Sequence, residues 1–133
     1  MRKLGRKKDH REHMMRNLAT SLILYERVTT TTPKAKELKR IIDKLISCAK
    51  SNDLSARRAL ISYVYDENAV KKMFEVIVPR FNTRSSGYTK IYKTSPRKGD
   101  LAEMSIIEFI KDEKPAKEDK KPAKPAKATK NKA

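Results

Sequence analysis

Residue types on which whole classes of proteins depend are scarce in this sequence of 133 residues. The single cysteine, Cys48, cannot form an internal disulfide, and we expect it to lie in a helix core. None of the three glycines lies in a glycine-rich phosphate loop, which argues against a nucleotide hydrolase. Tryptophan is absent, and no apolar run approaches the ~20 residues that a membrane-spanning helix needs. The basic N-terminus is not followed by an apolar export signal, so we expect a cytoplasmic protein with no membrane partner.

The residue sets that catalysis or metal binding would need are missing as well. His10 and His13 are three residues apart, but no pattern of further metal ligands accompanies them. The neighbouring carboxylates Asp66 and Glu67 precede an apolar helical period, where they favour the start of a helix. We therefore predict no enzymatic activity, no metal, no cofactor and no small-molecule substrate.

Acidic residues are few relative to basic ones. The chain has 33 Lys and Arg against 16 Asp and Glu, a net charge of +17. The isoelectric point is about 10.1 and the mean hydropathy is -0.78. The excess positive charge is spread over both ends and the middle of the chain, which favours a polyanion that touches several faces. Structured RNA is the first candidate.

Hydrophobic periodicity predicts a helix over residues 9–24, with Asp9 as its N-cap. The residues expected to face the core there are His10, Met14, Leu18, Leu22 and Tyr25, with Met15 beside them. The β-branched run 28–32 predicts a strand. Thr32 and Pro33 then form the N-cap and first position of a second helix, which extends to Ala49.

Two more helices and two strands complete the prediction. Asp53 caps a helix that reaches Tyr65, and Asp66 caps another that stops before Pro79. Residues 88–94 and 104–110 form an antiparallel pair of strands. The order of helix, strand, three helices and two strands predicts an α+β fold, a two-layer helix/sheet domain over residues 9–111. It lies between a basic arm (1–8) and a disordered Lys/Pro/Ala tail (112–133), which serves either solubility or loose phosphate contact.

Residues 80–98 are the part of the sequence most indicative of function. They contain six basic residues and no acidic one, and Phe81, Tyr88 and Tyr92 are interleaved with them. Cations neutralise phosphates and planar rings contact bases, so this mixture is typical of an RNA-binding segment. We expect Phe81 and one tyrosine to face the core.

Many of the same residues also carry a family resemblance, in three blocks: 2–6 with His10, Arg11, Met14 and 16–22; 30–40; and 79–81 with Arg84, 87–91, 97–100, Ala102, Met104 and 107–108. Over nearly the whole predicted domain these blocks resemble the bacterial large-subunit ribosomal protein seventeen family. Ser86, where that family usually has glycine, and the Lys/Pro/Ala tail depart from its pattern. The resemblance implies an α+β two-layer fold and an architectural role in the large subunit near the peptide tunnel exit. It also implies 23S ribosomal RNA and neighbouring large-subunit ribosomal proteins as partners.

A ribosomal RNA-binding structural protein is therefore the first hypothesis. The residues predicted to contact phosphates are Arg2, Lys3, Arg6, Lys7, Arg11, Arg16, Lys34, Lys36, Arg80, Arg84, Lys90, Arg97 and Lys98, with Arg80 and Arg84 as the main contacts. His10 and Asn17 are predicted to hydrogen-bond sugar or phosphate, and Tyr88 to stack on a base. A DNA-compacting protein acting through its tail is the second hypothesis, and an amphipathic protein on a membrane surface is a weaker third.

Overall fold

The computed structural model describes residues 1–110, so the predicted tail lies outside the described residues. The elements are α1 (Lys8–Tyr25), β1 (Arg27–Thr31), α2 (Thr32–Ala49), α3 (Leu54–Tyr63), α4 (Glu67–Lys72), the π-helical turn η1 (Met73–Ile77), α5 (Val78–Arg80), β2 (Thr89–Thr94) and β3 (Met104–Phe109). Because α4, η1 and α5 are continuous, they form one helical segment. The predicted order of elements is confirmed.

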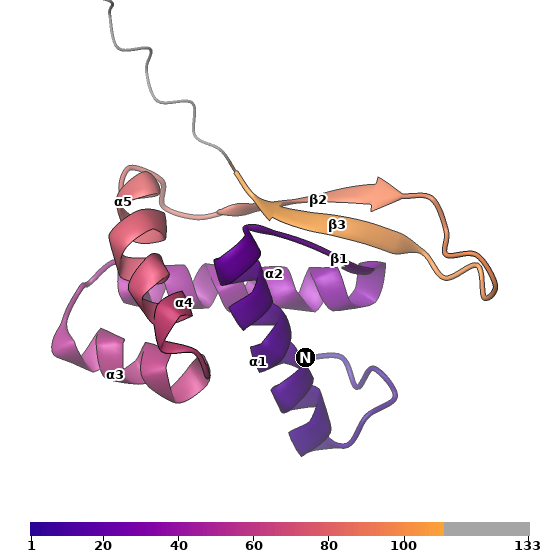
Figure 1. Cartoon of the computed structure of the whole chain (residues 1–133), viewed down its shortest axis with the longest axis horizontal. Helices are drawn as coiled ribbons and strands as arrows, with labels where there is room; N and C mark the ends of the chain where they lie inside the picture. Colours follow the sequence, from indigo (N-terminus) through magenta and orange to yellow (C-terminus); the bar gives the residue numbers. More distant parts are fainter. Residues whose placement is uncertain (111–133) are drawn as a thin grey trace, which may run out of the picture.

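The three strands form one antiparallel sheet in the order β1-β3-β2. The predicted pairing of the last two strands is confirmed, and β1 adds to the free side of β3. The helices of residues 1–110 all lie on one face of this sheet, which makes two layers (Figure 1). Along β3, Ser105, Ile107 and Phe109 are buried, so every second residue faces the helices.

The core lies between α1, α2, the α4–α5 segment and the inner face of the sheet. Helix α2 contributes an apolar stripe that includes Leu38, Ile42 and Ile46, all fully buried. Three aromatic rings close the core under the sheet. Phe81 lies 5.4 Å from Tyr88 and 6.1 Å from Phe109, between ring centroids. These tilted contacts add to the stability that burial of the rings provides.

Helix α1 is rotated relative to its predicted packing face. The residues that it buries are Met15, Ala19, Leu22 and Ile23. Two of the residues expected in the core, His10 and Tyr25, are exposed instead. The small side chain of Ala19 allows a neighbouring helix to pack closely against α1. Because apolar residues also lie on both sides of the buried stripe, the sequence did not fix the position of the stripe on the helix surface to within one residue. The N-cap is Lys7 and not Asp9, which lies within the first turn.

The β1–α2 junction also differs from the prediction by one residue. Thr31 ends the strand and is the N-cap, whereas Thr32 is the first residue of the helix. The Thr32 amide donates to the Glu103 carbonyl over 3.0 Å, and its Oγ1 lies 2.8 Å from Ser105 Oγ. The hydroxyl also donates to the Glu103 carbonyl over 3.3 Å, so contacts with β3 and with the residue before it occupy the group that was expected to cap the helix.

Pro79 does not stop the fourth helical segment, contrary to the sequence-based prediction. The backbone widens into the π-helical turn η1, in which the Val78 amide donates to the Met73 carbonyl. A π-helical turn makes room for the proline ring, which would otherwise clash with the preceding turn. The helix therefore continues to Arg80 and delivers Phe81 to the core.

The remaining helical predictions are confirmed in part. Asp66 caps α4, because its carboxylate accepts a 2.8 Å hydrogen bond from the Asn68 amide. Asp53 occupies the N-cap of α3 without a side-chain bond, and this helix ends at Tyr63 and not at Tyr65. Cys48 is exposed on α2, so its predicted core position is wrong. No helix within residues 1–110 is both long and apolar enough to cross a membrane.

Candidate nucleic-acid interface

Three basic segments that are distant in sequence meet at one end of the molecule. These are the arm before α1, the start of α2 and the turn between β2 and β3, at the right of Figure 1. Arg2 Nε lies 3.9 Å from Glu37 Oε1 on α2, and the bond from Thr32 to Glu103 connects the start of α2 to the hairpin. We call this region the arm–hairpin end. Its basic residues are Arg2, Lys3, Arg6, Lys7, Lys34, Lys36, Lys93, Arg97 and Lys98.

Few of these positive charges are neutralised within the protein. Buried Glu37 lies near Arg2 and Arg40, and Asp100 pairs with Arg97 over 2.6 Å. The hydrogen bonds from Arg97 lower the pKa of Asp100 to about 2, so this carboxylate is ionised at neutral pH. Exposed Lys3, Lys36 and Lys98 have no side-chain partner within residues 1–110. Such cations are available to phosphates.

The arm and α1 carry three arginines with unused hydrogen-bond donors. Arg6 Nη1 donates to the Leu4 carbonyl over 3.0 Å, and Arg11 Nη1 donates to the Arg6 carbonyl over 3.4 Å. In Arg6, Arg11 and Arg16 the Nε atom is shielded from solvent and has no partner in the described part of the chain. A buried donor on a cation is costly without an acceptor, and a phosphate oxygen would supply one.

Arg16 lies in an aromatic cluster between α1 and the end of α3. Its guanidinium carbon is 5.2 Å from the ring centroid of Tyr63 and 5.7 Å from that of Tyr65. On the outer side, His13 Nδ1 lies 2.5 Å from the Tyr65 hydroxyl. Burial raises the pKa of Tyr63, which keeps its hydroxyl protonated. The predicted contacts His10 and Asn17 are exposed on the same helix.

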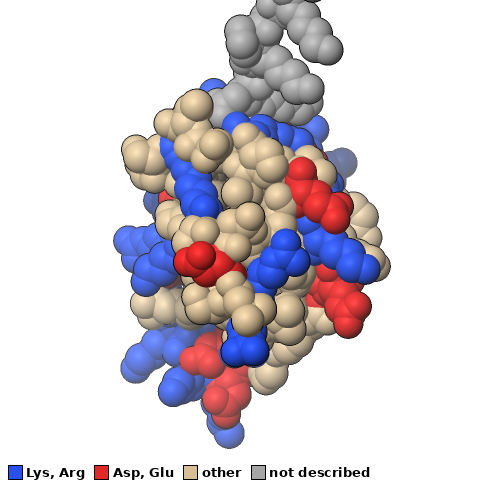
Figure 2. Space-filling view, turned by 90° about the vertical axis from the view of Figure 1, so that its left-hand side faces the viewer, with Lys and Arg blue, Asp and Glu red and all other residues tan. Residues whose placement is uncertain are grey.

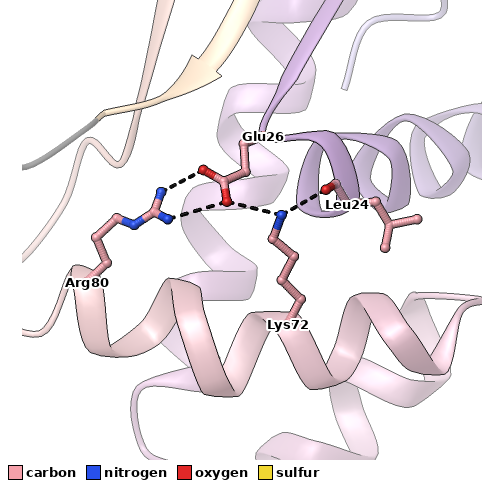
Figure 3. A network of polar contacts seen from close by, with 4 residues as sticks. All are labelled: Leu24, Glu26, Lys72 and Arg80. Atoms are coloured by element: carbon pink, nitrogen blue, oxygen red, sulfur yellow. Dashed lines mark hydrogen bonds and ion pairs between the residues drawn. The ribbon is translucent and has the colours of Figure 1, made fainter.

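Arg80, expected to be a main RNA contact, forms an ion pair within the protein (Figure 3). Its two terminal nitrogens donate to both carboxylate oxygens of Glu26, over 2.8 and 3.3 Å. Lys72 Nζ lies 3.0 Å from the same carboxylate and donates to the Leu24 carbonyl. The bonds from Arg80 and then Lys72 lower the pKa of Glu26 to about 2, against the effect of burial. The Arg80 guanidinium thus fastens α5 to the end of α1.

Tyr88 does not lie on the surface, and its predicted stacking on a base is wrong for this reason. Its ring is fully buried, and its hydroxyl donates to the Ser85 carbonyl over 2.8 Å. Lys50 Nζ lies 4.9 Å from the ring centroid and donates to the backbone carbonyl of Arg84. The 81–88 loop is thus fixed against the end of α2, so Arg84 lies at the opposite end of α2 from the arm.

The helical end, formed by α3, α4, η1 and α5, has a different distribution of charge. Figure 2 views this end and shows acidic side chains interspersed among basic and uncharged ones. Its acids include Asp53, Asp66 and Glu67. Arg57 lies over the ring of Phe74, with 4.9 Å between the guanidinium carbon and the centroid. The charges there are therefore partly balanced, in contrast to those of the arm–hairpin end.

One exposed aromatic residue was missed as a candidate site residue. Tyr92 lies on β2 and is 48% exposed, two residues after Lys90 on the same face of the strand. The strand period of two would have revealed this, because Ile91 between them packs toward the core. The exposed face of β2 therefore offers a cation and an aromatic ring together.

A small α+β domain, one end of which carries many basic side chains with few acidic partners, places this chain in the class of basic structural proteins that bind nucleic acid. The model of the family Ribosomal protein L17 matches residues 14–110, and the chain belongs to this family. It is 49% identical over 109 residues to the large ribosomal subunit protein bL17 of Caldanaerobacter subterraneus subsp. tengcongensis, covering 82% of this chain and 97% of that protein. The bL17 protein of Halothermothrix orenii is 49% identical over 111 residues, covering 84% and 97%.

Membership confirms the ribosomal hypothesis over the DNA-compacting and membrane-surface alternatives. The chain is a structural component of the bacterial large ribosomal subunit and not an enzyme. Its location is accordingly cytoplasmic, and its partners are ribosomal RNA and other ribosomal proteins.

Proposed function

We propose that the chain stabilises the 23S ribosomal RNA of the large subunit, and that the arm–hairpin end provides the main contact surface. The observation that carries this proposal is that three basic segments meet at one end of the molecule (Figure 1) and that each contains an exposed lysine without a side-chain partner within residues 1–110, namely Lys3, Lys36 and Lys98. Cations held in fixed positions by a folded domain recognise the shape of a phosphate backbone as well as its charge. A position near the peptide tunnel exit remains a prediction from the family resemblance.

The other predicted contacts extend this surface. Arg6, Arg11 and Arg16 present shielded donors along the arm and α1, and Lys90 adds a cation on β2. We keep Lys7, His10, Lys34 and Arg2 in the proposed interface because they lie on the arm or near the starts of α1 and α2, and we keep Asn17 because it is exposed in the middle of α1, next to Arg16. Arg97 and Arg80 are paired with carboxylates, so we assign them smaller direct roles.

The division into arm, domain and tail is part of the same proposal. Helix α1 begins at Lys8 and β3 ends at Phe109, which supports a domain over residues 9–111 between an arm over residues 1–8 and a tail over residues 112–133. In this arrangement the arm contacts RNA directly while the domain sets its position.

The test is incorporation of a variant into large subunits. The full chain with Lys3→Ala, Lys36→Ala and Lys98→Ala, called the arm–hairpin variant, should sediment with large subunits in low salt and dissociate in a high-salt wash. The unaltered chain should survive the wash at one copy per subunit. Equal retention of both chains would contradict the proposed interface. Stronger binding of the purified chain to duplex DNA than to 23S RNA fragments would contradict the proposed partner.

A further inference from the structure

The outer face of the sheet is left uncovered by the rest of residues 1–110 (Figure 1). Inward-facing residues of each strand, such as Thr30, Ile107 and Ile91, pack toward the helices. The alternating residues therefore point away from the helices. Met104 and Ile106, which point outward, are half-buried but do not belong to the core cluster.

Strand pairing arranges the outward-facing residues in three rows. The first row is Arg27, Glu108 and Lys90; the second is Thr29, Ile106 and Tyr92; the third is Thr31, Met104 and Thr94. The face thus has a charged row at one side, an aromatic and aliphatic row in the middle, and a row with two hydroxyls. The third row adjoins the turn that carries Arg97 and Lys98.

The charge of this face favours a polyanion. Its one carboxylate, on Glu108, lies 3.9 Å from Arg27 Nε. Lys90 is exposed and has no side-chain partner in the described chain. The surface is thus net positive, and it continues into the basic hairpin turn. An RNA strand held at the arm–hairpin end can cross it without meeting an uncompensated acid.

Tyr92 makes the face suitable for bases as well as phosphates. Phe81, Tyr88 and Phe109 are all buried in the core, whereas Tyr92 leaves 48% of its surface exposed beside Ile106. An exposed ring on a sheet stacks on an unpaired base of any sequence, and neighbouring cations hold the backbone. Paired bases are already stacked within their helix and gain little from such a ring.

We propose that the outer face of the sheet binds an unpaired segment of RNA, one base of which stacks on Tyr92. This inference rests on the proposed function, that the chain binds ribosomal RNA, and adds a second surface and the kind of RNA segment that it takes. Lys90 would neutralise a phosphate of that segment, and the hydroxyls of Thr29, Thr31 and Thr94 would face its riboses.

Binding of the full chain to two RNA probes tests the inference. One probe is a short oligouridylate, and the other is a blunt RNA duplex with the same number of phosphates. Tyr92→Leu keeps an apolar side chain but removes the ring, so affinity for the oligouridylate should fall by about 5- to 50-fold while duplex affinity changes less than about twofold. Tyr92→Phe keeps the ring and should bind both probes like the unaltered chain.

Phe74→Leu is the matched control, because this ring lies at the helical end, 4.9 Å from the Arg57 guanidinium carbon and outside the proposed RNA surface. It should leave both affinities within about twofold. Equal losses in the two leucine variants, or none in Tyr92→Leu, would overturn the inference. The arm–hairpin variant distinguishes a failure of this inference from a failure of the proposed function. If the proposed function is right, this variant should weaken binding of both probes. If it weakens neither, the proposed function itself fails.

The assembled subunit provides a second test that does not depend on the isolated chain. A photoreactive phenylalanine derivative in place of Tyr92 should crosslink to ribosomal RNA, at nucleotides outside paired helices. Crosslinks to a neighbouring ribosomal protein would overturn the inference and assign this face to protein docking.

Discussion

The two ends of the molecule carry many cations each but use them differently. At the helical end, Arg80 and Lys72 are joined to Glu26, and Arg57 lies over an aromatic ring. At the arm–hairpin end, Lys36 and Lys98 project from ordered segments without a side-chain partner within residues 1–110. The first set of cations holds helices together, and the second is available to a ligand. A basic residue therefore indicates an interface only if its side chain is not already paired with another group of the protein.

The arm–hairpin variant should produce the largest change that distinguishes the two ends. Affinity falls as salt rises, and each lost phosphate contact reduces the magnitude of the slope of log affinity against log salt by about 0.7–0.9. Three substitutions should therefore reduce this magnitude by about 2 and weaken RNA binding by about 100-fold. Titration of a 23S RNA fragment at several salt concentrations measures both quantities. The loss should be similar for all structured RNA sequences tested, because phosphates carry no sequence information.

A variant of the helical end with the same change in charge provides the control. Arg57→Ala, Arg58→Ala and Lys71→Ala also remove three positive charges from exposed positions. This variant should retain RNA affinity within about fivefold, because only the long-range field is reduced. Equal losses in both variants would mean that net charge, and not the arrangement of the arm–hairpin end, governs binding.

Arg80→Ala should affect folding more than RNA binding. Loss of the bidentate, charge-assisted pair between Arg80 and Glu26 should lower the free energy of unfolding by about 2 kcal/mol. The loss is not larger because Lys72 still neutralises part of the Glu26 charge. Urea unfolding measures this loss, and Arg58→Ala, which breaks no such pair, should change stability by less than about 0.5 kcal/mol. Unchanged stability with weakened RNA affinity would return Arg80 to the interface.

The sequence predicted the order of the elements because its local patterns are strong. Helix α2 follows from its apolar stripe and from Pro33 at its start, and the two-strand hairpin follows from its β-rich segments. Errors arose where tertiary contacts decide between neighbouring positions. Thr32 bonds to β3 in place of capping α2, and a π-helical turn accommodates Pro79 within a helix.

The site was less predictable than the fold, since charge pairing depends on contacts between distant residues. Arg80 and Glu26 are separated by 54 positions, so nothing local marks their pairing. Tyr88 and Tyr92 are four residues apart in one basic segment, yet one lies in the core and the other on the sheet face. Strand periodicity was sufficient to place Tyr92, but the burial of Tyr88 just before the strand required the packed structure.

Acid should selectively remove the contribution of Glu26 at the helical end. Its pKa of about 2 in the folded protein is below the ordinary value of 4.5, so it stabilises the fold fully above about pH 5. This contribution is lost as the pH falls from about 5 toward 2. It cannot exceed the loss of unfolding free energy expected for Arg80→Ala, which breaks the same ion pair. The stability difference between the unaltered chain and Glu26→Gln, measured by urea unfolding, should shrink over that range. A difference that stays constant with pH would contradict the pairing.

Tyr88→Phe should produce the smallest effect and sharpen the contrast between the two tyrosines. The substitution keeps the buried ring and removes the 2.8 Å bond from the hydroxyl to the Ser85 carbonyl. Because this carbonyl lies at an exposed residue that water can reach, the loss should be about 0.5–1 kcal/mol of unfolding free energy. RNA affinity should stay within about twofold of the unaltered chain, since the ring lies in the core and not at the interface. Urea unfolding and RNA titration of the same protein sample separate the two effects. If RNA affinity fell while stability did not, the Tyr88 hydroxyl would have to reach RNA, and the proposed difference in role between Tyr88 and Tyr92 would be wrong.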